Sequence, residues 1–196
     1  MKFTKIVAAA AAIVALSTTA HAATLASGTL GDIDNPTNTS LGFTFGATGG
    51  TGTLQFVLDG FTSLDGANAY EDDFTLTVNG TDIFKATWDL GGGGGTVIYS
   101  NPNGASFSGG TFGSFAGGAY NISVPIALLS GTNTVSFSYY SLPSPYAGFQ
   151  NTGDEGWGIG KYSVTTPVPE PANGALLLAG LGALGAVLRR RARNAA

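Results

Sequence analysis

The sequence contains no cysteine and a single histidine, His21. The absence of cysteine excludes disulfides, thiolate metal ligands and thiol nucleophiles. Charged residues make up only 10% of the chain, which is well below their usual share in globular domains. Hydrophobic residues nevertheless reach 43%, which argues against intrinsic disorder. A chain of 196 residues is long enough to bury one sizeable core.

Basic residues are scarce between the two ends of the chain. Residues 23–168 hold eleven acidic side chains and only two basic ones, Lys85 and Lys161, which gives a net charge of −9. Because phosphate recognition needs a basic patch, we expect no nucleic-acid partner. This charge favours cations, or neutral polymers such as glycans, as partners.

The N-terminal segment has the three-part pattern of a secretory signal peptide. Two early lysines are followed by an apolar stretch and then by small residues that fit a cleavage site, namely Ala20, Ala22 and Ala23. We expect residues 1–22 to form a signal helix that signal peptidase removes, and His21 is lost with it. The mature chain then lacks both histidine and cysteine, which excludes Ser-His-Asp and Cys-His catalysis and histidine metal centres.

The C-terminal segment, 167–196, combines three features in order. The tripeptide Pro169, Glu170 and Pro171 is followed by an uncharged stretch and then by an arginine cluster. The cluster consists of Arg189, Arg190, Arg191 and Arg193. We expect a transmembrane helix over 172–188, because a helix of about 17 residues reaches the lower limit for crossing a bilayer. The positive-inside rule then keeps the arginines in the cytoplasm.

This arrangement of Pro169-Glu170-Pro171, a stretch rich in Gly, Ala and Leu, and terminal arginines resembles the PEP-CTERM sorting signal of exported proteins in Gram-negative bacteria. In that family an exosortase, a membrane cysteine protease-transpeptidase, processes the tail, and the hosts make exopolysaccharide and biofilm. The resemblance implies transient anchoring in the inner membrane, followed by release or transfer to the cell surface. The prolines cannot continue a helix, which keeps the tripeptide extended and accessible. A generic single-pass anchor is the alternative interpretation.

Residues 23–166 predict an all-β domain, a β-sandwich or jelly roll of about eight short antiparallel strands. Apolar residues alternate with polar ones over 53–59, 74–78 and 135–139, and no window has a sustained helical period. Further strands are expected near 41–46, 81–84, 96–100, 119–124 and 156–165. The glycine-rich stretches 91–95 and 109–118 predict flexible surface loops.

Asn79-Gly80 is the strongest hairpin signal in the chain, because a type I′ turn needs positive φ at both central residues. A two-residue turn pairs Val78 with Thr81 and places Leu76 opposite Ile83. Residues 126–137, with a Gly-x-Asn loop, and 154–159 resemble segments of galactose-binding-like jelly rolls. That resemblance implies the fold, with carbohydrate or calcium binding as a frequent use, and fold alone does not establish function.

Two acidic segments are candidates for a structural calcium ion, since Ca²⁺ prefers oxygen ligands on loops. The first comprises Asp65, Glu71, Asp72 and Asp73, and the second is Asp32-x-Asp34-Asn35. The alternative is that these charges are solvated and protect strand edges. No other cofactor is expected.

Aromatic side chains offer a candidate platform for stacking on sugars. We expect Phe137 and Trp157 to lie in the core, where aromatics of small β-sandwiches usually pack. Tyr140 and Tyr146 are the candidates for exposure and glycan binding.

Three function hypotheses follow. The leading one is a non-enzymatic, exported protein of the cell surface or of the extracellular matrix, associated with biofilm or exopolysaccharide. The alternative is a secreted carbohydrate-binding module, whose binding either depends on calcium or does not. A glycan-cleaving enzyme is the third, although the body offers only two glutamates, Glu71 and Glu155, for paired-carboxylate chemistry and we assign no catalytic residue.

Overall fold

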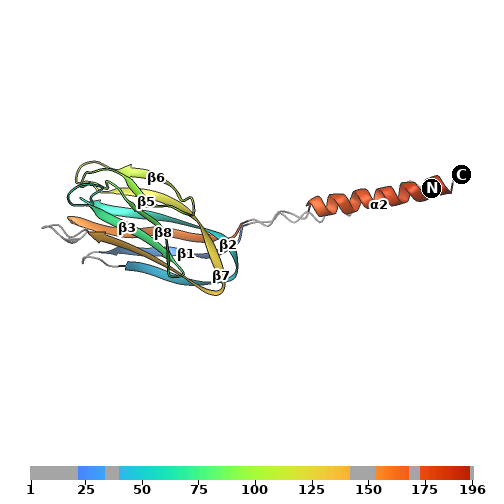
Figure 1. Ribbon diagram of the computed structural model, residues 1–196, viewed down its shortest axis with the longest axis horizontal. Helices are drawn as coiled ribbons and strands as arrows, with labels where there is room; N and C mark the ends of the chain where they lie inside the picture. The colour runs from blue at the N-terminus through green and yellow to red at the C-terminus, as the bar shows by residue number, and fades with distance from the viewer. Residues whose placement is uncertain (1–21, 34–39, 142–152, 168–172, 195–196) are drawn as a thin grey trace. The chain divides into compact units, whose positions relative to one another are not determined.

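The computed structural model describes residues 22–33, 40–141, 153–167 and 173–194 (Figure 1). The chain divides into two units. Ala23–Pro167 holds the eight strands of the described residues, and the other unit comprises Met1–Ala22 and Val168–Ala196. The predicted signal peptide, apart from Ala22, and the Pro-Glu-Pro tripeptide lie outside the described residues.

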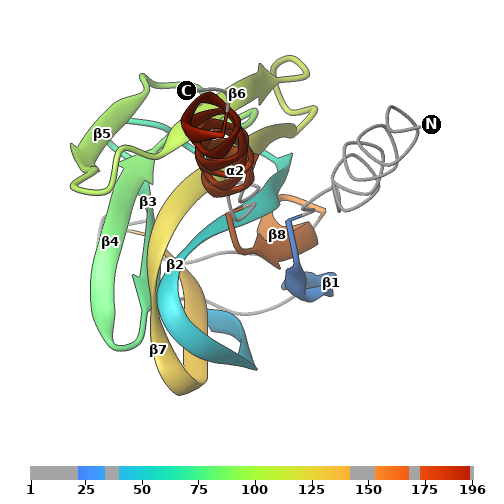
Figure 2. The same ribbon diagram turned by 90° about the vertical axis from the view of Figure 1, so that its right-hand side faces the viewer.

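All pairings between the named strands of this unit are antiparallel. Its strands are β1 (Thr24–Ile33), β2 (Ser40–Thr62), β3 (Asp72–Val78), β4 (Thr81–Thr87), β5 (Val97–Ser100), β6 (Ser106–Thr111), β7 (Gly118–Ser141) and β8 (Glu155–Thr165). They pair in the order β1-β8-β2-β7-β3-β4-β5, with β6 also on β7 (Figure 2). The prediction of an all-β fold of antiparallel strands is confirmed.

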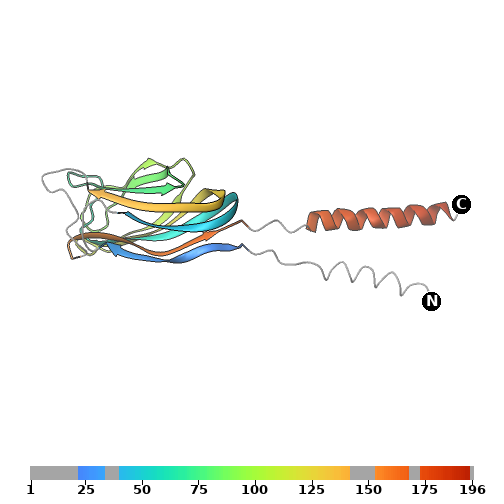
Figure 3. The ribbon, with the colours of Figure 1, turned by 90° about the horizontal axis from the view of Figure 1, so that it is seen from below.

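Two long strands, β2 and β7, belong to both layers of the unit. They pair with each other along nearly their whole length. Over 53–62 β2 also pairs with β8, and over 118–123 β7 also pairs with β6. Over 135–141 β7 pairs with β3 instead. One layer therefore contains β1, β8, β2, β7 and β6, and the other contains β2, β7, β3, β4 and β5 (Figure 3).

The separate strands predicted at 41–46 and 53–59 are parts of the single strand β2, and those at 119–124 and 135–139 are parts of β7. The sequence between the two halves of β2 is rich in glycine. Gly49 and Gly50 have φ of 89° and 103°, and the strand continues through them. Because glycine adopts positive φ without a steric penalty, pairing with β7 continues on both sides.

The Asn79-Gly80 hairpin joins β3 and β4 as predicted. Both turn residues have positive φ, 51° and 78°, and Val78 is the partner of Thr81. The expected pairing of Leu76 with Ile83 is wrong, because the register shifts by one residue and Leu76 pairs with Phe84. The bulge lets Ile83 and Phe84 both enter the core, where they are 8% and 0% exposed.

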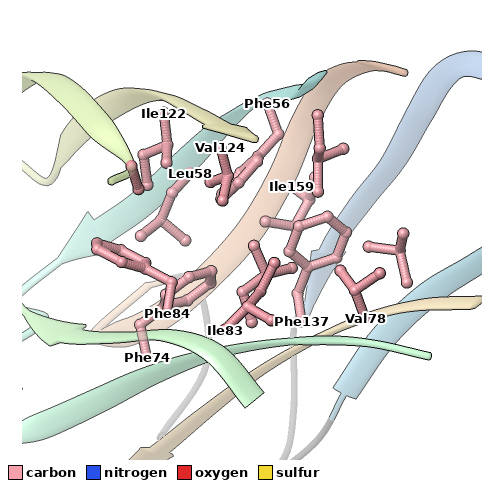
Figure 4. Packing of buried hydrophobic residues seen from close by; sticks show 14 of the residues in the cluster. Phe56, Leu58, Phe74, Val78, Ile83, Phe84, Ile122, Val124, Phe137 and Ile159 are labelled. Atoms are coloured by element: carbon pink, nitrogen blue, oxygen red, sulfur yellow. The ribbon is translucent and has the colours of Figure 1, made fainter. Parts of the chain in front are cut away.

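The core lies between the two layers. Leu58 and Val124 from one layer meet Phe74 and Phe84 from the other (Figure 4). The expectation that Phe137 and Trp157 are core residues is confirmed, since both are fully buried. Buried aromatic and branched side chains of this kind supply about 1.5–3 kcal/mol each to the free energy of folding.

The C-terminal unit contains the helix α2 (Asn173–Arg193). Its last turn carries Arg190, Arg191 and Arg193, where cations are favourable. The predicted helix is present, but no helix of the described residues combines the length and the hydropathy that a membrane span requires.

Candidate functional site

The layer of β1, β8, β2, β7 and β6 has an outer face that is polar. Along β2, Phe56 and Leu58 are buried in the core, so Gln55, Val57 and Asp59 point to the outside. The same alternation applies to β7, where Ile122 and Val124 are buried and Ser123 between them faces outward. These alternate residues form a surface that the strands hold rigidly.

A row of four polar side chains crosses this outer face. Gln55 on β2 is the register partner of Ser163 on β8 and of Ser123 on β7, and Ser123 in turn pairs with Ser106 on β6. Directly opposed residues of neighbouring strands lie about 4.5–5.5 Å apart at Cβ. The row therefore presents one amide and three hydroxyls at a single level of the sheet.

A groove of about 660 Å³ lies over this row. Asn121 and Ser108, which are register partners, line it as well, and so does Lys161. We name this surface the polar groove. Its amide and hydroxyl groups both donate and accept hydrogen bonds, which suits a ligand that is itself rich in hydroxyls.

A second cavity, of about 510 Å³, lies further along the same strands. Asp32 at the end of β1 and Asp59 on β2 line it, and both are register partners of Gly158 on β8. A Cβ at Gly160 would lie 2.7 Å from Oδ2 of Asp59, so the glycines of β8 make room for the carboxylates. Burial, and secondarily the charge of Asp32, raises the pKa of Asp59. We name this the Asp32–Asp59 cavity.

Two exposed aromatic rings complete the second cavity. Phe112 and Phe115 are 72% and 71% exposed and line it from the loop between β6 and β7. The N–H of Phe115 donates to the carbonyl of Gly91 at 2.8 Å. Gly91 and Gly117 are buried, and a Cβ at Gly91 would lie 2.8 Å from the nitrogen of Gly117. The prediction that both glycine-rich stretches are surface loops is therefore wrong in part, because their backbones pack on each other where side chains would not fit.

The first predicted calcium segment places its carboxylates in other contacts. Oδ2 of Asp72 accepts the N–H of Asp65 at 2.9 Å. Asp73 forms an ion pair with Lys85, with 2.7 Å between Oδ2 and Nζ.

Glu71, the remaining member, accepts a hydrogen bond from the hydroxyl of Tyr99. This bond raises the pKa of Tyr99 to about 12. No three acidic or histidine side chains of the described residues are grouped as ligands of a metal ion. Calcium at this segment stays a prediction, as it does for Asp34 and Asn35, which lie outside the described residues.

Glu155 lies near this acidic segment, at the start of β8. Burial raises its pKa to about 7, and the charges of Asp65 and Asp154 add to the effect. The neighbouring Asp154 is fixed by Ser63, whose hydroxyl donates to its carbonyl at 2.9 Å. Glu155 is thus a carboxyl group that is protonated in part at neutral pH.

Of the two predicted glycan-binding tyrosines, Tyr140 is 44% exposed as expected. It pairs with Asp73 between β7 and β3, in the other layer, and lines neither cavity. Tyr146 lies outside the described residues. The structure does not bring Tyr140 to the polar groove.

Comparison with known protein families identifies a motif in the C-terminal segment. Residues 167–191 match the model of the PEP-CTERM protein-sorting motif, which confirms the resemblance noted for this segment. Such a motif implies an exported protein. No curated protein sequence matches the chain.

Among solved structures, the chain is similar to several carbohydrate-binding modules. "CBM35 from Cellvibrio japonicus Abf62" has 14% identity and a TM-score of 0.33, with 64% of this chain and 63% of that chain covered. A family 35 module from an environmental isolate has 18% identity and a TM-score of 0.35, with 74% and 81% covered. "Carbohydrate-Binding Module CBM36 in complex with calcium and xylotriose" has 8% identity and a TM-score of 0.33, with 76% and 95% covered. The chain thus spans less than two thirds of the first of these.

Proposed function

We propose that this protein works outside the cytoplasm as a non-enzymatic protein of the cell surface or matrix, and that its C-terminal segment is a sorting signal. In this proposal signal peptidase removes 1–22, and an exosortase-type transpeptidase processes the tail at Pro169-Glu170-Pro171. The observation that carries the proposal is the match of 167–191 to the PEP-CTERM motif. The host is then a Gram-negative bacterium that makes exopolysaccharide and biofilm.

Replacing Pro169, Glu170 and Pro171 together by alanine tests the sorting step. We expect the full-length form to accumulate in the cells and release of the strand unit to fall at least tenfold, measured by immunoblot of cells and medium. Asn194→Ala, outside the matched segment, is the control and leaves release unchanged. Equal release of the triple variant and the wild type would contradict the sorting role.

A specific observation favours carbohydrate binding by the strand unit as a second function. The polar groove gathers a row of one amide and three hydroxyls from four strands. Because the strands already hold these groups in place, binding a ligand costs little conformational entropy. The low content of basic residues in 23–168 favours an uncharged or cationic polymer over an anionic one. Exopolysaccharide is a polymer of the required kind outside the cell.

A glycan array probed with the full chain, with and without EDTA, tests this second function. We expect binding that the double variant Gln55→Ala, Ser123→Ala weakens at least tenfold. Ser130→Ala with Thr132→Ala, at exposed positions in the middle of β7 and away from the polar groove, is the control. The EDTA arm separates a calcium-dependent from a calcium-independent mode. Absence of any glycan signal would refute the second function, and release of shortened glycan products would refute the non-enzymatic assignment.

A further inference from the structure

The Asp32–Asp59 cavity has two features that are unfavourable for stability and that packing of the core does not require: exposed aromatic rings and strained backbone. Phe112 and Phe115 expose most of their rings, whereas large apolar side chains of a soluble protein are normally covered. Phe115 also has a φ of 55°, in the left-handed region that favours glycine. Thr62, which lines the same cavity, has a φ of 59°. Strained backbone conformations of this kind are found mainly at functional sites, where the surrounding protein structure holds the strained residue in place.

The charges in this cavity all have one sign. Of the residues that the structure describes, its lining includes the carboxylates of Asp32 and Asp59 and no basic residue. Lys85 forms a salt bridge with Asp73, and neither of these residues lines the cavity. Lys161, the other basic side chain of 23–168, lines the polar groove instead. The cavity is therefore electrostatically complementary to a cation.

The cavity continues the polar groove along β2. Gln55 and Val57 line the polar groove, and Asp59 and Phe61 line the cavity. Since a strand rises about 3.3 Å per residue, these outward positions extend over roughly 20 Å. A linear polymer that follows β2 thus meets amide and hydroxyl groups first, and carboxylates beside aromatic rings afterwards.

We infer that the polymer recognised by this outer face is a polysaccharide with protonated amino groups, and that the Asp32–Asp59 cavity binds an amino sugar. The ammonium group of such a sugar donates charge-assisted hydrogen bonds to the carboxylates of Asp32 and Asp59. The phenyl rings of Phe112 and Phe115 stack on the sugar and attract the cation through their faces. A bound ammonium also offsets the repulsion between the two carboxylates. The inference rests on the proposed carbohydrate binding and specifies its ligand.

Isothermal titration of the full chain at pH 6 tests the inference with two matched probes, a glucosamine hexasaccharide and an N-acetylglucosamine hexasaccharide. We expect the amine probe to bind at least tenfold more tightly. Asp59→Asn and Asp32→Asn each remove most of this preference and leave the acetylated probe unaffected. Asp82→Asn, which neutralises an exposed carboxylate on β4, is the control and keeps the preference.

Phe115→Gly separates binding from folding. Glycine removes the strain at φ 55°, so we expect an unchanged or higher melting temperature together with at least fivefold weaker binding of the amine probe. Unchanged binding by this variant would show that the ring does not contact the ligand and would overturn the assignment of the cavity.

The remaining outcomes distinguish the two proposals. Equal binding of both hexasaccharides, with Gln55→Ala still weakening both, would refute the amino-sugar inference and leave the carbohydrate function standing. Binding of neither hexasaccharide, together with a blank glycan array, would refute both. Equal binding of a hexalysine peptide would show a general cation surface and would also overturn the inference.

Discussion

Asp32 and Asp59 flank Gly158, which is the register partner of both. The two carboxylates come from β1 and β2, which are separated along the sheet by β8. A side chain at Gly158 would meet the carboxylate of Asp32 and would lie 2.9 Å from the carbonyl oxygen of Gly31. The position of this carboxylate therefore depends on the absence of a side chain from the strand between the two.

Gly158→Ala tests this dependence. We expect the free energy of unfolding to fall by about 1–3 kcal/mol, because the new methyl group contacts both the Asp32 carboxylate and the backbone. Gly46→Ala, on β2 with open space around its Cβ, is the matched control and changes stability by less than about 0.5 kcal/mol. Urea denaturation measures both, and equal midpoints for the two variants would contradict the close approach.

Asn133→Ala tests the polar contacts that the buried Asn133 side chain makes in the middle of β7. The Asn133 side chain is fully buried, accepts the N–H of Leu129 at 2.8 Å and the amide of Asn79 at 2.9 Å, and donates to the Leu129 carbonyl at 3.0 Å. Removing it leaves these groups without partners, so we expect a loss of about 2–3 kcal/mol. Asn121→Ala, at an exposed position of the same strand, leaves thermal stability unchanged. Equal melting temperatures for Asn133→Ala and Asn121→Ala would contradict a stabilising role of the Asn133 side chain.

The pH dependence of stability reports on Glu155. Its pKa is about 7 in the folded protein and 4.5 in the reference state. A raised carboxyl pKa means that the folded state binds the proton more tightly, so the stabilisation is complete below about pH 4.5 and is lost as pH rises through 7. After allowance for solvent screening we expect Glu155 to account for about 1 kcal/mol of this decline.

Comparison of the wild type with Glu155→Gln isolates this contribution. The variant should show a flatter stability profile between pH 5 and 7, measured by urea denaturation at each pH. Raised pKa values at Asp59 and Asp65 act in the same direction and remain in both proteins. Parallel profiles for the two proteins would contradict the assignment to Glu155.

The sequence predicted the fold class because its strongest signals are local. The alternation over 74–78 and the Asn79-Gly80 turn need no tertiary information, and both appear in the structure. The strand β1, with the small and polar sequence TLASGTLGDI, has too little alternation to be recognised, and it is a strand because β8 pairs with it. The end of β6, from Gly109 to Thr111, falls in the stretch predicted as a loop, because that prediction rests on glycine content alone.

The candidate site was largely missed, because its residues come together only through strand pairing. The alternation over 53–59 places Leu54, Phe56 and Leu58 on one face of a strand, and Gln55 and Asp59 on the other. Which strands lie beside β2 depends on the long-range register, and that register aligns Ser163, Gln55 and Ser123. Phe112 and Phe115 did carry a signal, namely apolar rings within a glycine-rich segment.

Mass spectrometry of the protein recovered from the culture medium tests the central claim of export and tail processing most directly. We predict a polypeptide that begins at Ala23 and ends between residues 169 and 172. Extracellular protein that retains Arg189, Arg190, Arg191 and Arg193, or that begins at Met1, would contradict it.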